Sequence, residues 1–284
     1  ARPACSRVGV IVTPSVQGVS APLVVTALLV LSGSCALWNS SRVSAPAVSS
    51  HVRRPFFLLR LSVGDMTRTA VVAGVGPRIG EAVARRLHAA GYSVGLFARS
   101  ESFIDELSTD LGEAALAVPT DVTDTAAVTE GMASVRETFG PVEALVLNAT
   151  GGGGRPIDDA SVDRLRSIFD ARVAGSLACV QAVREDLQET EGTVVFSGTT
   201  YAEGGVTEQV EWGAVAPAAR GLATSLSAAL DSVQVTYVRI GDRVVPAGSD
   251  GHRALTADEV AETYLGLIAR DQVVTRELAL SRRG

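Results

Sequence analysis

The clearest chemical signal in this sequence is an apolar run that leads into a glycine turn. Residues Val71 to Gly80 read V-V-A-G-V-G-P-R-I-G, which predicts a buried strand, a tight turn and the start of a helix. The N-terminus of a helix presents free N–H groups and a positive dipole end, so it binds phosphate. Gly74, Arg78, Ile79 and Gly80 are therefore candidate contacts for the phosphates of a dinucleotide.

Polar residues follow the next three apolar runs and extend this candidate site. Arg99 follows the second run, where an acid would bind the ribose 2′-hydroxyl of NAD(H) and an Arg favours the 2′-phosphate of NADP(H). Asp121 and Val122 follow the third, where a carboxylate can accept a hydrogen bond from an adenine amino group. Asn148 and Ala149 follow the fourth, where the nicotinamide half would lie. The predicted cofactor is NADP(H), preferred over NAD(H).

Alternating strands and helices must position these residues. Helical periodicity between the apolar runs, as in Ile79, Val83 and Leu87 before Gly91, predicts βαβ units. We therefore expect an α/β fold: a Rossmann-type doubly wound parallel sheet, in three layers α/β/α, as a single domain over 66–284. The expected strands are Thr69–Ala73, Ser93–Phe97, Ala115–Pro119, Ala144–Leu147, Thr193–Phe196 and Val233–Ile240.

Residues 1–65 differ in composition from the rest. Residues 1–64 contain Arg but no Asp or Glu, and Ala21–Trp38 is their most apolar stretch. Three interpretations stay open: sequence translated from upstream of a start at Met66, a cleaved targeting segment, or a membrane anchor. The domain over 66–284 carries an excess of acids, which argues against nucleic acid as a partner. We expect it to be cytoplasmic and not membrane-bound.

Residue usage limits the available chemistry. The chain has no lysine, so no step can use a lysine amine. Its cysteines and histidines form no clustered motif, which predicts neither a metal site nor a disulfide framework. They are Cys5, Cys35 and Cys179, and His51, His88 and His252.

Over 66–284 the sequence resembles the short-chain dehydrogenase/reductase family. The family's turn reads T-G-x-x-x-G-x-G, and Gly74 and Gly80 match its first and last glycines, while Arg78 replaces the middle one. Its N-N-A-G motif appears as Leu147–Thr150, and its aspartate after the third strand matches Asp121. A Cβ at position 78 would obstruct a close pyrophosphate, whereas an outward-pointing Arg would add positive charge near the adenosine phosphates. Both interpretations stay open.

The resemblance implies an oxidoreductase that acts on a small-molecule carbonyl or alcohol. It also implies a homodimer or homotetramer. The final stretch, Thr275–Leu280, resembles the tail strand of one branch of the family, which often takes part in dimer packing.

The same resemblance implies that the usual reaction centre is altered. The family uses Asn, Ser, Tyr and Lys, and alignment on Arg220–Ala223 puts Arg172, Thr199, Trp212 and Ala216 at those positions. An indole N–H has no useful acidity, an alanine offers no polar group, and an arginine stays protonated. The resemblance therefore implies a non-standard or impaired active site.

Two residues stay candidates for a rearranged reaction. Thr199 keeps a hydroxyl, and Tyr201 follows two residues later at the same edge of the sheet; Gly151–Gly154 forms a flexible run beside it. Two functions therefore stay open. One is an oxidoreductase with a rearranged site, and the other is a non-catalytic nucleotide-binding sensor or partner subunit.

Overall fold

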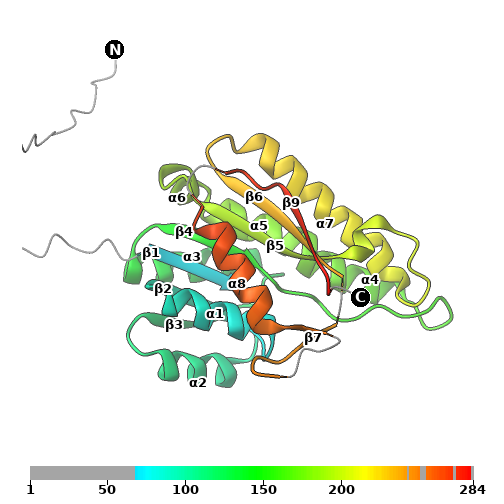
Figure 1. Cartoon of the computed structure of the whole chain (residues 1–284), viewed down its shortest axis with the longest axis horizontal. Helices are drawn as coiled ribbons and strands as arrows, with labels where there is room; N and C mark the ends of the chain where they lie inside the picture. Colours follow the sequence, from blue (N-terminus) through cyan, green and yellow to red (C-terminus); the bar gives the residue numbers. More distant parts are fainter. Residues whose placement is uncertain (1–67, 242, 250–253, 271–272, 283–284) are drawn as a thin grey trace, which may run out of the picture. The chain divides into compact units, whose positions relative to one another are not determined.

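A seven-stranded parallel sheet forms the centre of the domain (Figure 1). The computed structural model describes residues 68–284 except 242, 250–253, 271–272 and 283–284, so the three interpretations of residues 1–65 lie outside the described residues. In sheet order the strands are β3 (Ala115–Pro119), β2 (Tyr92–Ala98), β1 (Arg68–Ala73), β4 (Val142–Leu147), β5 (Thr193–Thr199), β6 (Gln234–Ile240) and β9 (Glu277–Leu280).

The strand order reverses between β1 and β4, which makes that junction the switch point of the sheet. All six predicted apolar runs fall on strands, and the doubly wound parallel sheet is confirmed. One boundary differs in a way that matters for the site. β5 continues through Ser197, Gly198 and Thr199 because these residues pair with β6. Thr199 is therefore the last residue of β5. The apolar run alone predicted a strand that ends at Phe196.

Helices cover both faces of the sheet, as Figure 1 shows, and complete the three predicted layers. One face carries α1 (Ile79–Ala89), α2 (Glu101–Leu111) and α8 (Ala257–Ile268). The other carries α3 (Thr125–Phe139), α5 (Gly175–Ala182) and α7 (Val210–Ala229). The remaining elements are α4 (Val162–Phe169), the π-helical turn η1 (Asp170–Ala174), α6 (Arg184–Glu189), the 3₁₀ turn η2 (Thr200–Glu203) and the small pair β7 (Val244–Val245) and β8 (Leu255–Thr256).

Two apolar cores lie on opposite faces of the sheet. Successive strand residues alternate between them: Val71 and Ala73 pack into the core under α3, α5 and α7, and Ala70 and Val72 into the other. This explains why the strands read as continuous apolar runs. Cys179 is buried in the first core, where desolvation raises the pKa of its thiol to about 12, so it is inert at neutral pH.

Helix α4, turn η1 and helix α5 follow one another without a break from Val162 to Ala182. The wider π-helical turn places an extra residue in the helical path, a feature frequent at functional sites. It carries Arg172. Among the described residues, no helix combines the length and the apolar character that crossing a membrane requires.

Candidate functional site

A pocket of about 880 Å³ lies at the carboxyl ends of β1 to β4, at the switch point of the sheet. This is the volume of a typical small-molecule site. We call it the switch-point pocket. It brings together all nine residues predicted to contact a cofactor, and their role in binding stays a prediction. These residues are Gly74, Arg78, Ile79, Gly80, Arg99, Asp121, Val122, Asn148 and Ala149.

The glycine turn forms one wall of the pocket, and at two of its positions there is no room for a side chain. Gly74 has φ +104°, and a Cβ there would come within 2.3 Å of the Ala149 nitrogen. A Cβ on Gly80 would come within 2.5 Å of the Gly74 oxygen. Gly76 differs, since a Cβ there would meet no atom within 4 Å and would extend into open space. The backbone of the turn is thus exposed to whatever occupies the pocket.

Arg78 is the last residue of the turn before α1. It has φ −147° and ψ −110°, and its side chain is exposed. The two interpretations of this residue, an obstructing Cβ and an outward-pointing charge, both stay predictions. The guanidinium adds a positive charge to the pocket lining, close to the first N–H groups of α1.

Asn148 links two walls of the pocket. Its side-chain amide donates a hydrogen bond of 2.8 Å to the Gly74 carbonyl, and its backbone N–H donates one of 2.7 Å to the Ala73 carbonyl. These bonds hold the end of β4 against the turn after β1. Asn148 thus fixes the shape of the pocket in addition to lining it.

Charged residues that follow β2 and β3 form the end of the pocket that lies away from β4. Arg99 is exposed, and Asp121 Oδ1 accepts hydrogen bonds from the Thr123 N–H at 3.0 Å and the Thr123 hydroxyl at 2.8 Å. The Thr123 N–H, then its hydroxyl and the nearby charge of Arg99, lower the pKa of Asp121 despite partial burial. The carboxylate is thus ionised at neutral pH and held in a fixed orientation.

One wall of the pocket was missed by sequence reasoning. It comes from α4 and the start of η1, which contribute Asp163, Arg166, Ser167 and Asp170. No strand end marks these residues; they face the pocket because the chain after β4 folds back over it. A polar helix in this segment was the only available signal. Val244 of β7 closes the pocket on another side.

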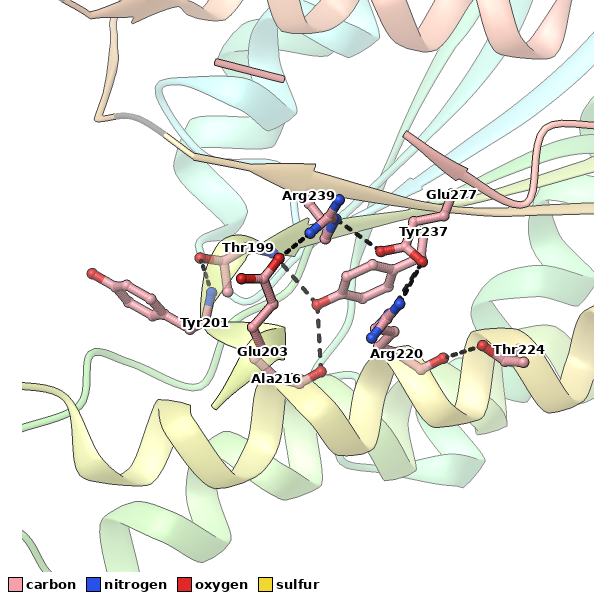
Figure 2. A network of polar contacts seen from close by, with 9 residues as sticks. All are labelled: Thr199, Tyr201, Glu203, Ala216, Arg220, Thr224, Tyr237, Arg239 and Glu277. Atoms are coloured by element: carbon pink, nitrogen blue, oxygen red, sulfur yellow. Dashed lines mark hydrogen bonds and ion pairs between the residues drawn. The ribbon is translucent and has the colours of Figure 1, made fainter. Parts of the chain in front are cut away.

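The two predicted catalytic residues, Thr199 and Tyr201, are not part of the pocket lining. The Thr199 hydroxyl accepts a hydrogen bond of 3.3 Å from the Tyr201 N–H, and the Tyr201 ring points away from its neighbours (Figure 2). Tyr201 is half-buried and packs against the core under α7. The catalytic role of both residues stays a prediction.

The neighbours of Thr199 belong to a charged network around the end of the sheet (Figure 2). Glu277 of β9 accepts from Arg220 of α7 at 2.8 Å and forms an ion pair of 2.8 Å with Arg239 of β6. Arg239 also pairs with Glu203 of η2. The hydrogen bond that Arg220 donates to Glu277 raises the pKa of Arg220. The network joins the last strand to the helix that carries positions 212 and 216.

Arg172 is buried, and two backbone carbonyls accept hydrogen bonds from its guanidinium. Its Nη1 donates to the Ala149 carbonyl at 3.1 Å, and its Nη2 donates to the Ser197 carbonyl. The guanidinium carbon lies 5.3 Å from the centre of the Trp212 ring, a cation–π distance. No carboxylate forms an ion pair with Arg172 within the described part of the chain.

Trp212 and Ala216, the residues predicted at the family's Tyr and Lys positions, carry neither an acid nor a base, and their alignment with that motif stays a prediction. The Trp212 indole N–H donates to the Gly152 carbonyl at 3.0 Å, so its one polar group is used within the protein. Ala216 is buried in the core of the domain. The Tyr237 hydroxyl donates to the Ala216 carbonyl at 3.4 Å, and burial raises the pKa of this phenol.

The glycine run at 151–154 is held in place, contrary to the flexible run expected from its composition. Besides Trp212, the start of α7 contacts residues 154–161 through Gln209, which accepts from the Gly154 N–H, and through Glu211. Glu211 accepts from the Arg155 N–H at 2.7 Å and the Ser161 N–H at 3.1 Å. We call this set of contacts the loop latch. Tertiary partners fix a segment that its own sequence leaves free.

Comparison with known proteins identifies the family. Residues 68–246 match the family model of the short chain dehydrogenases. Together with the doubly wound sheet and the glycine turn at its switch point, this shows that the chain belongs to the short-chain dehydrogenase/reductase family, a family of oxidoreductases.

Relatives and solved structures agree with this assignment. An uncharacterized oxidoreductase of Staphylococcus aureus is 29% identical over 208 residues, which cover 70% of this chain and 89% of that protein. The alcohol dehydrogenase of the archaeon Thermococcus sibiricus, solved with 5-hydroxy-NADP, has 25% identity and a TM-score of 0.69, covering 77% of this chain and 99% of that one. Serine dehydrogenase of Escherichia coli has 25% identity and a TM-score of 0.67, covering 75% and 96%.

Proposed function

We propose that this domain binds NADP(H) in the switch-point pocket and is an oxidoreductase of small carbonyl or alcohol compounds with an altered reaction centre. The observation that carries the proposal is the convergence of the glycine turn, the start of α1 and the ends of β2 to β4 on one pocket. The residues fit a dinucleotide: the turn leaves its backbone open at Gly76, and α1 offers free N–H groups to a pyrophosphate.

Preference for the 2′-phosphate rests on Arg99 and Arg78. Both are exposed cations on the pocket lining, and no acid follows β2 at the position that would bind a free 2′-hydroxyl. The T. sibiricus alcohol dehydrogenase, which was solved with an NADP derivative, is in keeping with this preference.

Proton transfer must differ from that of the family. Bound NADPH would supply a hydride, and the acceptor oxygen would then need a proton. Trp212 has no acidic proton to give, so the Thr199 hydroxyl or a water molecule has to relay it. Thr199 accepts from the Tyr201 N–H and keeps its own hydroxyl proton as a donor.

A second function is favoured by one specific observation. Arg172 and Trp212 direct their N–H groups to backbone carbonyls at the positions where the family binds and protonates its substrate. A nucleotide-binding sensor or partner subunit without turnover would have such a centre. The two functions differ in one measurable property, which is cofactor consumption.

Calorimetric titration with NADPH and NADH tests the binding proposal. We expect the wild-type protein to bind NADPH more tightly than NADH. In Arg99→Glu the NADPH affinity should fall roughly 10- to 100-fold, the value of a lost charge-assisted hydrogen bond, while NADH affinity changes little. A screen of carbonyl compounds with NADPH then separates an oxidoreductase from a sensor.

Two variants serve as controls in these titrations. Arg184→Glu makes the same charge reversal on exposed α6, away from the pocket lining, and should leave both affinities unchanged. Gly74→Asp should abolish binding, because a side chain there collides with the backbone of Ala149. Absence of NADPH binding to the wild-type protein would contradict both proposed functions.

We also propose that two copies associate through the outer side of the α4–α5 helix. Val162, Phe169 and Leu177 are exposed large apolar residues there, at 62%, 42% and 36% of their full accessible surface. They stand seven and eight residues apart, and the extra residue of turn η1 brings Leu177 back to the side of Phe169. Such a stripe is typical of a helix that packs against a partner.

A further inference from the structure

Arg172 is an unusual group to find in the core of a domain. It is 5% exposed, and among the described residues it has no carboxylate partner and its Nε has no hydrogen-bond partner. A buried charge is expensive unless other groups compensate for it. In the described part of the chain, two carbonyl dipoles and the Trp212 ring do so.

The phenols near Arg172 do not neutralise it. Tyr237 and Tyr264 are both buried, and desolvation raises the pKa of each, so both stay uncharged at neutral pH. Burial lowers the pKa of the Arg172 guanidinium, yet an arginine stays protonated near neutral pH. The site therefore carries one fixed positive charge that solvent does not screen.

This charge lies directly behind one end of the switch-point pocket. Arg172 donates to the carbonyl of Ala149, and Ala149 and Ala171 line the pocket at the end of β4. At the switch point, this is the end expected to take the nicotinamide half of a dinucleotide. Asp170 is the acid nearest in sequence on the lining, and it is exposed, so water weakens its opposing field.

We propose that Arg172 makes this pocket selective for the reduced cofactor over the oxidised one. The inference rests on the proposed binding of NADP(H). An oxidised nicotinamide ring carries a positive charge and a reduced ring carries none, so a fixed cation behind the pocket wall repels only the oxidised form. Two unit charges roughly 8 to 10 Å apart, at an effective dielectric constant of about 20, give about a tenfold or larger difference in dissociation constant.

The test is the ratio of the dissociation constants of NADP⁺ and NADPH, measured by calorimetry. We expect a ratio of about ten or more in the wild-type protein. Arg172→Gln removes the charge and keeps an amide donor for the carbonyls of Ala149 and Ser197, and it should lower the ratio about tenfold. Arg172→Lys keeps the charge and should keep the ratio. Asp170→Asn should raise the ratio slightly.

Several outcomes would overturn the inference. One is a wild-type protein that binds NADP⁺ as tightly as NADPH, a result that needs no variant to fold. Another is an Arg172→Gln variant with native circular dichroism and an unchanged ratio. Failure of the wild-type protein to bind either form would instead overturn the proposed function, and the inference with it. Because each ratio compares two ligands on one protein, a general loss of affinity does not affect it.

Discussion

At the scale of single residues, the residues predicted to bind and those predicted to react lie in different places. The predicted binding residues line the pocket: glycines where a Cβ would collide with backbone, and polar groups after each strand. The residues predicted at the reaction centre are an indole, a methyl group and a buried guanidinium, and none of them is on the pocket lining. The proposed change of the reaction centre therefore leaves the pocket itself intact.

Placing Tyr and Lys at the two aligned positions tests the proposed change of the reaction centre. We expect Trp212→Tyr combined with Ala216→Lys to raise the rate of NADPH-dependent carbonyl reduction about a hundredfold, the usual contribution of a positioned general acid. The measurement is NADPH consumption against a panel of aldehydes and ketones, beside the wild-type protein.

Each single variant is the control for this pair. A Tyr without the Lys lacks the neighbouring ammonium of the family's pair, and a Lys without the Tyr has no acid to tune, so both should stay near the wild-type rate. An inactive double variant that still binds NADPH would mean that the pocket cannot seat a substrate, or that positions 212 and 216 are misaligned with the family's motif.

The pocket residues were predictable because they follow from a local rule. Polar residues at the ends of parallel strands share one edge of the sheet, so Arg99, Asp121 and Asn148 could be placed from strand positions alone. The wall from α4 could not, because its approach depends on how the chain folds back after β4. The burial of Arg172 was equally hidden, since its partners are backbone carbonyls that carry no sequence signal.

At the scale of elements, the loop latch couples the glycine run to the start of α7. Glu211 is 3% exposed and accepts two backbone N–H groups of the loop. Burial acts to raise the pKa of this carboxyl, but the N–H donors of Arg155, of Glu211 itself and of Ser161 outweigh it, and the pKa is lowered.

The latch should therefore weaken in acid. Because the folded pKa of Glu211 is lowered, its stabilisation is complete above the unfolded pKa of about 4.3 and is lost as the pH falls through the folded value. We expect Glu211→Gln to have a lower melting temperature than the wild-type protein at pH 7. That difference should shrink as the pH is lowered toward 3, measured by circular dichroism.

Glu208→Gln is the matched control for this measurement, since Glu208 is exposed three residues earlier. It should follow the wild-type curve at every pH. A difference between Glu211→Gln and wild type that stays constant from pH 7 to pH 3 would show that the charge of Glu211 does not hold the loop.

At the scale of the whole molecule, the exposed apolar stripe on the α4–α5 helix would connect the proposed association of two copies to the pocket. The same helical segment lines the pocket on its inner side with Asp163 and Arg166 and carries Val162, Phe169 and Leu177 on its outer side. A partner that packs on the outer side would hold the wall of the pocket in position. Association would therefore favour the geometry that the pocket needs.

A charge placed in the stripe should separate the copies. In Leu177→Glu we expect the dissociation constant of the dimer to rise about a hundredfold or more, because a buried carboxylate without a partner is costly. Sedimentation velocity over a range of concentrations measures this. Ala89→Glu, on an exposed residue of α1 on the opposite face of the sheet, is the control and should sediment like the wild-type protein. An unchanged profile for Leu177→Glu would place the association elsewhere.

The position of Trp212 also has an optical consequence. The indole emits light whose colour depends on its surroundings, and here it lies between the Gly152 carbonyl and the Arg172 cation. The chain has only two tryptophans, and the other, Trp38, lies outside the described residues. A Trp38→Phe protein would thus carry a single emitter at the junction of loop, helix and pocket wall. Opening of the loop, or a ligand settling against that wall, would be visible as a change in its fluorescence.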